Sequence, residues 1–252
     1  MVRGKLQEVR GIGPSCVSGT NRHGAGKAGH DQSAHSVYVG GMSWWDTAYR
    51  SGRVPWDAGE FDRHLPAVLG RLQLASGRVF DAGCGNGKSA VWLAENGFEV
   101  IGVDQSAPAI EQARRRAVSR GTHERTRFIV ARFPDEVASA DLKHTLAPAS
   151  FDLVIERAFL QHVGSRQALK RTVGILAELL TVDGALFSLM IASEGMAESW
   201  GITRWSRREV RRALEPVFVI EEMYLDVFTP GKPGSVPAWV TPARPGHGRP
   251  PR

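Results

Sequence analysis

The sequence predicts an α/β protein built on a doubly wound, largely parallel sheet. Between residues 78 and 226, short apolar runs typical of buried strands alternate with stretches of helical periodicity. A glycine-rich turn, residues 83–87, directly follows the first of these runs, and the second run ends in Asp104. Parallel strands joined by right-handed crossovers bring their carboxyl ends to one edge of a sheet. We therefore expect the turn and Asp104 to meet at that edge.

The first half of the predicted sheet follows from local patterns along the chain. Apolar residues at helical spacing, including Leu65 and Leu69, predict a helix over residues 62–74 ahead of the first strand. Gly97 ends the helix that follows the glycine turn, and Ser106 caps the helix that follows Asp104. The expected order is strand 78–81, helix 87–96, strand 99–104, helix 107–119 and strand 127–131.

The second half continues the alternation and then reverses direction. A long amphipathic pattern predicts a helix over residues 166–180, and the arginine-rich stretch 207–214 predicts another. Strands are expected over residues 151–156, 184–192, 217–226 and 238–240. The last two form an antiparallel terminal hairpin, which brings the predicted sheet to seven strands.

Composition fits one such domain. The chain has 252 residues, of which 42% are apolar, and no run approaches the ~18 apolar residues of a membrane span. Its two cysteines, Cys16 and Cys84, lie in unrelated stretches, and the amino end lacks the apolar core of a signal peptide, so we expect a reducing, cytoplasmic location. The formal net charge is +6, but the arginines cluster in helical stretches, which indicates solvated helix faces rather than a nucleic-acid partner. We expect a monomer or homodimer.

Residues 1–41 differ from the rest of the chain. They are rich in glycine and scattered basic residues, with Tyr38 as their single aromatic residue and no apolar periodicity. Ordering such a segment costs conformational entropy with little burial to offset it. We therefore expect a disordered tail over residues 1–41, a folded domain over residues 42–252, and a natural start at Met42. A phosphate-binding or regulatory arm is the alternative interpretation of the tail.

The glycine turn allows three interpretations, each for a different ligand. A phosphate-binding P-loop ends as Gly87 and Lys88 do, but it requires a glycine where the chain has Ala82. A dinucleotide fingerprint leaves Asp81 and Gly83 without a role and places a carboxylate beside a pyrophosphate. In the third, D-x-G-x-G-x-G over residues 81–87, Asp81 faces an ammonium group and the glycines approach an adenosyl-amino acid.

This third pattern resembles the class I methyltransferases that use S-adenosylmethionine (AdoMet). The resemblance implies a Rossmann-like, seven-stranded methyltransferase sheet with AdoMet as the cofactor. It assigns cofactor contacts to residues at the carboxyl ends of the first two strands. These are Asp81, Gly83, Gly85, Asp104 and Gln105. Asp104 is the expected partner of the two ribose hydroxyls.

An aromatic segment, WWDTAYRSGRVPWDAG, precedes the sheet. Aromatic faces attract a sulfonium by about 0.5–2 kcal/mol and exclude water from its methyl group. The alternative is a helix that packs its tryptophans onto the edge of the sheet. The spacing resembles the amino-terminal segment of thiol and halide methyltransferases and of the related thiopurine methyltransferases. In that family three aromatic positions contact the cofactor, and here they are Trp45, Tyr49 and Trp56, although tryptophan is commoner at the middle position.

Further candidate residues follow strands three and four. Glu156 and Arg157 stand where this family carries an Asp-Arg or Asp-Tyr pair bordering AdoMet and substrate; an ion pair between them on the surface is the alternative. Arg132 and Phe133 follow strand three, where methyltransferases flank adenine, although core packing would equally explain Phe133. His162 is a candidate proton acceptor or a scaffold residue. No metal site is predicted.

Methyl transfer from a sulfonium is a direct displacement, which depends mainly on alignment in a dry site. A thiol needs little or no general base, whereas a hydroxyl needs one. No catalytic dyad is evident in the sequence, so we expect methyl transfer to a small-molecule nucleophile, a thiol in the leading hypothesis, with Arg157 holding an anionic substrate or lowering the pKa of the thiol. The alternatives are an O-, N- or C-methyltransferase of a natural product or metabolite, and a noncatalytic nucleotide- or RNA-associated protein.

Overall fold

The structure is a computed structural model that describes residues 43–54, 56–57, 62–194, 203–228 and 236–246, except for the side chains of residues 140 and 141. These residues belong to the larger of two compact units, Gln32–Arg252. The predicted tail over residues 1–41 lies outside the described residues.

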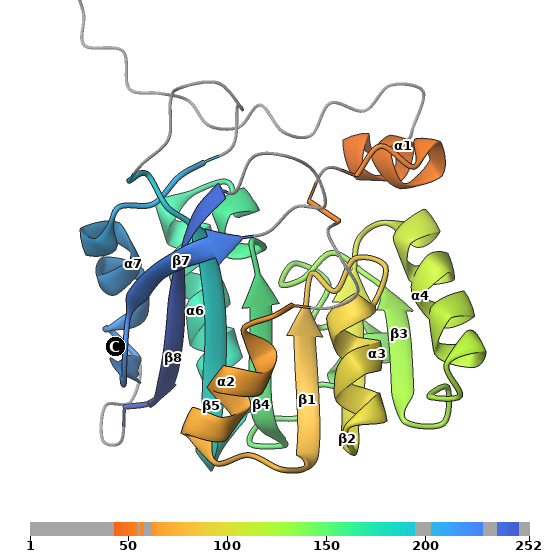
Figure 1. Cartoon of the computed structure of the whole chain (residues 1–252), viewed down its shortest axis with the longest axis horizontal. Helices are drawn as coiled ribbons and strands as arrows, with labels where there is room; N and C mark the ends of the chain where they lie inside the picture. The colour runs from red at the N-terminus through yellow and green to blue at the C-terminus, as the bar shows by residue number, and fades with distance from the viewer. Residues whose placement is uncertain (1–42, 55, 58–61, 195–202, 229–235, 247–252) are drawn as a thin grey trace, which may run out of the picture. The chain divides into compact units, whose positions relative to one another are not determined.

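One sheet of eight strands forms the centre of the described chain (Figure 1). The strands are β1 (Gly77–Ala82), β2 (Phe98–Asp104), β3 (Thr126–Val130), β4 (Phe151–Arg157), β5 (Leu180–Ile191), β6 (Phe218–Ile220), β7 (Tyr224–Phe228) and β8 (Val236–Pro245). Their order is β3-β2-β1-β4-β5-β8-β6, and β7 also pairs with β8. Strands β1 to β5 are parallel to one another, whereas β8 is antiparallel to β5, β6 and β7. The predicted doubly wound α/β class and its antiparallel end are confirmed.

The strand count differs from the prediction at one place. The single strand expected over residues 217–226 is divided into β6 and β7 by residues 221–223. Glu221 and Glu222 in this interruption pair with Arg244 and Arg71. The long strand β8 pairs with both β6 and β7. Phe218 of β6 lies opposite Pro245, and Tyr224 of β7 lies opposite Val240. The sheet therefore has eight strands rather than seven.

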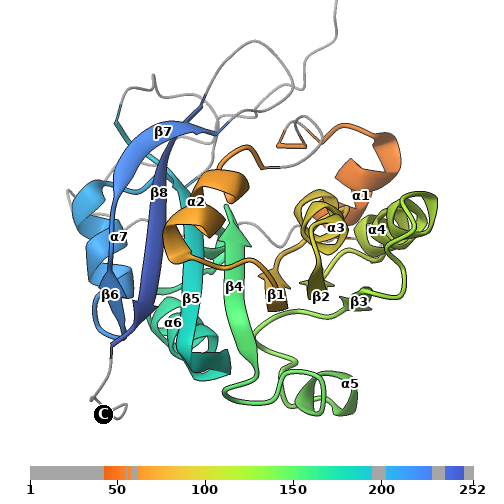
Figure 2. The same cartoon turned by 60° about the horizontal axis from the view of Figure 1, so that its bottom comes forward.

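Two helical layers cover the sheet (Figure 2). The helices are α1 (Trp44–Ser51), α2 (Leu65–Leu72), α3 (Lys88–Glu95), α4 (Ala107–Ser119), α5 (Ala140–Lys143), α6 (Arg166–Leu179) and α7 (Arg207–Leu214). Helices α2, α3 and α4 bury apolar side chains on one face of the sheet, and α5, α6 and α7 do so on the other. Alternation along the strands supplies both cores, because Val79 points into the first and Phe80 into the second. None of the described helices has the length and apolar character needed to cross a membrane.

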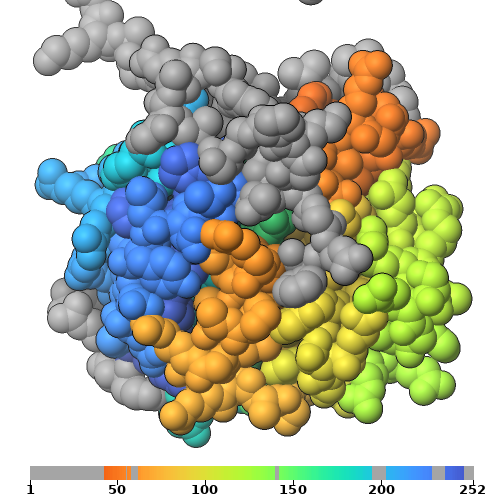
Figure 3. All heavy atoms as spheres, in the orientation of Figure 1, coloured from red at the N-terminus to blue at the C-terminus, as the bar shows by residue number. Residues whose placement is uncertain are grey.

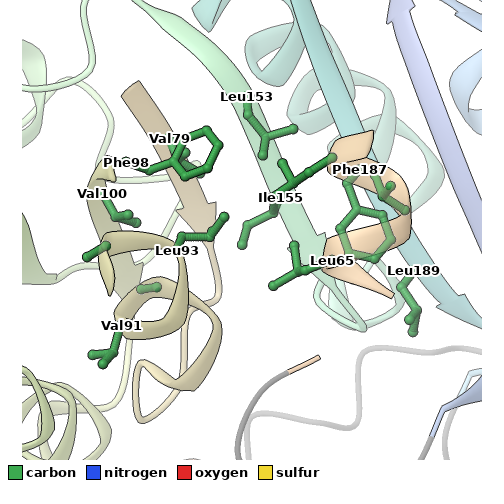
Figure 4. Close-up of a cluster of buried hydrophobic side chains, with 14 of the residues drawn as sticks. Leu65, Val79, Val91, Leu93, Phe98, Val100, Leu153, Ile155, Phe187 and Leu189 are labelled. Carbon is green, nitrogen blue, oxygen red and sulfur yellow. The ribbon is translucent and has the colours of Figure 1, made fainter. Parts of the chain in front are cut away.

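Helix bounds follow the local signals. Helix α4 begins at the predicted residue because the Ser106 hydroxyl accepts a hydrogen bond from the Ala109 amide, and α7 begins after a capping box between Ser206 and Glu209. Helix α2 is shorter than the predicted 62–74. Figure 4 shows Leu65 of α2 and Leu93 of α3 in the first core with Ile155 of β4. Figure 3, in the orientation of Figure 1, shows atoms of this helical layer, coloured orange to yellow, at the surface of the molecule.

Candidate functional site

The glycine turn between β1 and α3 is closely enclosed by side chains. Gly83, Gly85 and Gly87 all have positive φ angles, 72°, 55° and 74°. A Cβ atom at Gly85 would lie 2.5 Å from the Tyr49 hydroxyl oxygen, and one at Gly83 would lie 2.9 Å from Phe159. Both the backbone conformation and the close approach therefore require glycine here. The amides of Gly83 and Cys84 donate to the Val103 carbonyl, which ties the turn to the end of β2.

Two carboxylates flank this turn at the carboxyl ends of β1 and β2. Asp104 accepts hydrogen bonds from the Gly85 amide (3.0 Å) and the Ser106 amide (2.8 Å). Asp81 is only 3% exposed, and no described residue donates a hydrogen bond to its carboxylate. Burial, reinforced by the charge of Asp104, raises the pKa of Asp81 to about 8. Burial also raises the pKa of Asp104 to about 6, although its two amide donors oppose the rise. Asp81 is therefore largely protonated at pH 7 in the free protein, and a cationic ligand beside it would favour its ionised form.

The aromatic segment contains helix α1 and lies against this turn. Trp56 donates from Nε1 to the Tyr49 hydroxyl (3.1 Å), and the rings of Trp45 and Trp56 lie 5.1 Å apart, edge to face. Burial, together with the charge of Asp104, raises the pKa of the Tyr49 phenol, so this group remains a hydrogen-bond donor. Gln112 of α4 donates to the Tyr49 carbonyl (3.0 Å). Residues 44–51 of the segment are thus helical, as the packing alternative holds, and the segment also brings aromatic rings to the glycine turn.

Asp57, which follows Trp56, anchors the segment to the start of α3. One carboxylate oxygen accepts from the Asn86 side-chain amide (2.8 Å), and the other lies 2.6 Å from the Lys88 ammonium. Lys88 therefore neutralises Asp57, which is consistent with rejecting the P-loop interpretation of the turn. Sequence reasoning did not select Asp57, because its partners lie about 30 residues away and no local pattern marks them.

Glu156 and Arg157 point to different partners at the end of β4. Glu156 is fully buried; it accepts from the Ser188 hydroxyl and from the amides of Phe159 (3.2 Å) and Leu160 (3.1 Å). Burial raises the pKa of Glu156 to about 7, against these hydrogen bonds. Arg157 pairs instead with Asp62, at 2.5 Å between Nε and Oδ2. The alternative of an ion pair between Glu156 and Arg157 is therefore wrong.

The remaining candidates are distributed around this edge of the sheet. His162 lies edge-on to Trp45, with ring centroids 4.8 Å apart, so the structure brings it to the aromatic segment. Gln105 and Arg132 are exposed directly after β2 and near the end of β3. Phe133 is 6% exposed and packs against Phe80 with ring centroids 5.1 Å apart, which favours the core-packing alternative for this ring.

The family described as thiopurine S-methyltransferase (TPMT) matches residues 42–232. The chain belongs to the thiopurine S-methyltransferase family. Membership confirms the resemblance drawn from the glycine turn and the aromatic segment. It also confirms the prediction of a methyltransferase with AdoMet as its cofactor.

The names of the chain's relatives indicate different methyl acceptors. A ubiquinone biosynthesis O-methyltransferase from Azoarcus is 30% identical over 123 residues, 49% of this chain and 48% of its own. A probable thiol methyltransferase from Arabidopsis thaliana is 31% identical over 94 residues, 35% of this chain and 42% of its own. The chain spans about half the length of the first curated relatives it matches.

Solved structures show the same fold. The 1,6-didemethyltoxoflavin-N1-methyltransferase of Burkholderia thailandensis has a TM-score of 0.62 and is 21% identical; the alignment covers 79% of this chain and 84% of that one. At this identity the likeness extends to the fold alone.

Proposed function

We propose that this protein transfers the methyl group of AdoMet to a small-molecule thiol. The observation that carries the proposal is the contact between the aromatic segment and the glycine turn, where the Tyr49 hydroxyl lies over Gly85. The thiol acceptor is supported by membership of the thiopurine S-methyltransferase family and by the likeness to a probable thiol methyltransferase. A cytoplasmic location and a monomeric or homodimeric state stay predictions from the sequence.

In this proposal the carboxylates of Asp81 and Asp104 bind different parts of AdoMet. Asp81 receives the ammonium of the methionine moiety, whose charge offsets the unfavourable burial of the carboxylate. Asp104 accepts from the ribose hydroxyls while its amide donors hold it in place. Gln105 and Arg132 flank the adenine.

The aromatic segment encloses the sulfonium. The rings of Trp45 and Trp56, 5.1 Å apart, supply electron-rich faces, and the Tyr49 phenol donates a hydrogen bond toward the cofactor. Their packing excludes water from the methyl group, which favours displacement by a desolvated nucleophile.

Arg157 and His162 act on the methyl acceptor. Arg157 favours the thiolate over the thiol by its positive charge and can hold an anionic substituent. Its charge reaches the cofactor side of the site, because it opposes the rise in the pKa of Asp81. His162, against Trp45, is the available proton acceptor for a less acidic nucleophile. Glu156 acts indirectly, since its hydrogen bonds hold the loop that carries Phe159.

A second candidate keeps the cofactor and changes the acceptor to oxygen. The likeness to an O-methyltransferase favours it. Methyl transfer from labelled AdoMet to thiophenol, phenol and aniline, compared at equal concentration, separates the two. We expect thiophenol to be methylated and phenol and aniline to remain unmodified. Methylation of phenol with thiophenol inert would replace the thiol proposal by the oxygen one, and no transfer to any acceptor would contradict both.

A further inference from the structure

A chain of charged groups connects the end of β4 to α2 and β7. Asp62 lies just before α2, Arg157 ends β4, and Asp226 belongs to β7. The side chain of Asp62 is 2% exposed, and its ion pair with Arg157 joins residues far apart in the sequence. Arg63 pairs with Asp226, so the four side chains form two ion pairs, Asp62 with Arg157 and Arg63 with Asp226.

Asp62 is fully engaged by two partners. Its Oδ1 accepts from the backbone amide (2.8 Å) and Nδ1 (2.7 Å) of His64, and its Oδ2 accepts from Nε of Arg157 (2.5 Å). Burial opposes ionisation, but the hydrogen bond from His64 and the charge of Arg157 hold the pKa of Asp62 below its usual range. Nε2 of His64 lies 3.3 Å from Oδ2 of Asp226. His64, two residues later in the sequence, thus fixes the orientation of the Asp62 carboxylate.

The guanidinium group of Arg157 is contacted along one edge and over one face. Nε is bound by Asp62, and the guanidinium carbon lies 4.3 Å from the centroid of the Phe228 ring. Its side chain is 24% exposed, and no described residue accepts a hydrogen bond from its two Nη groups. A guanidinium has five N–H donors in a rigid plane, so fixing the Nε edge also fixes the direction of the other four.

These contacts lie beside the glycine turn. Glu156, which precedes Arg157, pairs across the sheet with Ala82, and Ala82 precedes Gly83. The terminal donors of Arg157 are therefore presented at the same edge of the sheet as the glycine turn, where strand ends bind ligands.

We propose that Asp62 is a positioning residue, which holds Arg157 by its Nε edge and so presents the two Nη groups to an anionic group of the methyl acceptor. The inference rests on the proposed function, and it adds that acceptors with a carboxylate are preferred over neutral ones. Without Asp62 the long side chain of Arg157 is free to rotate, and ordering it on binding weakens the complex.

The test compares Asp62→Asn with Asp226→Asn. Both variants replace a carboxylate of this group of charged side chains by an amide of equal size. Only Asp62 contacts Arg157. We expect Asp62→Asn to lower kcat/KM for 3-mercaptobenzoate relative to thiophenol by about fivefold to tenfold, through KM, because one long side chain must then be ordered on binding. Asp226→Asn should leave this ratio unchanged. An unchanged ratio in Asp62→Asn, or an equal fall in both variants, would overturn the proposal.

A second measurement separates this inference from the thiol proposal. Benzoate carries the carboxylate without a nucleophilic sulfur, and its binding to the complex with S-adenosylhomocysteine is measured by calorimetry. Asp62→Asn should weaken benzoate by a similar factor and leave S-adenosylhomocysteine affinity unchanged, whether or not thiols are methylated. Equal benzoate affinity in the wild type and the variant would refute the positioning role. Should Asp62→Asn not fold, Asp62→Glu, which keeps the charge but displaces the guanidinium, is held to the same outcomes.

Discussion

The hydroxyl oxygen of Tyr49 lies over Gly85, 2.5 Å from the position that a Cβ atom would occupy there. This contact joins two motifs that are separate in the sequence, the aromatic segment and the glycine turn. Trp56 reinforces it by donating to the same hydroxyl, and Asp57 does so by pairing with Lys88 at the start of α3. We propose that these aromatic rings cover a cofactor bound over the turn.

Gly85→Ala should abolish high-affinity AdoMet binding. A left-handed conformation costs a non-glycine residue about 1–2 kcal/mol, and the new methyl group would displace Tyr49. Gly97→Ala is the matched control, because Gly97 also has a positive φ (94°) but no heavy atom lies within 4 Å of its Cβ position. Calorimetry should show loss of AdoMet binding in the first variant and nearly normal affinity in the second. Equal affinities would show that the turn does not form the cofactor site.

AdoMet binding should release protons below pH 8. The pKa of Asp81 is about 8 in the unliganded protein, so the carboxyl group is largely protonated at pH 7, and an adjacent ammonium favours its ionised form. The group loses its proton on binding, so AdoMet affinity rises as pH increases from 6 to 7.5. Calorimetry in buffers with different ionisation enthalpies measures the released protons. Asp81→Asn should remove most of this release; the same release in the variant would assign it to another group.

Trp45→Leu and Trp56→Leu should weaken AdoMet more than S-adenosylhomocysteine. Leucine keeps much of the apolar area, but it lacks the electron-rich face that attracts the sulfonium. The difference should reach about 0.5–2 kcal/mol, the range of a cation–π contact. Trp44→Leu is the control, because Trp44 is 51% exposed. If both ligands lose the same affinity, the two tryptophans only pack.

A protein that begins at Met42 should fold and bind AdoMet as the full chain does. We propose that residues 1–41 form a tail, because their composition cannot bury a core. Thermal melting and calorimetry on both proteins provide the measurement. A large fall in melting temperature on truncation would show that the tail packs against the domain.

Local signals in the sequence predict much of this fold. Ser106 and Pro108 mark the start of α4, and the structure begins it at the predicted residue. The division of residues 217–226 into β6 and β7 depends on pairing with β8, which no local pattern reveals. The partners of Asp57 and Asp62 are likewise set by the tertiary fold, since the Arg157 that binds Asp62 comes from a distant strand. The sequence thus indicates candidate site residues, but it does not reveal the contacts that orient their side chains.

The choice between sulfur and oxygen is tested most directly by an acceptor that carries both. 4-Mercaptophenol has a thiol and a hydroxyl on one ring, so both nucleophiles are present at the same concentration, and the methylated atom reports which one the site selects. The thiolate is populated near neutral pH without a general base. Incubation with AdoMet and the protein, followed by chromatography and mass spectrometry against both standards, should yield 4-(methylthio)phenol. Formation of 4-methoxybenzenethiol instead, or of no product above the protein-free control, would contradict the proposed thiol methyltransferase.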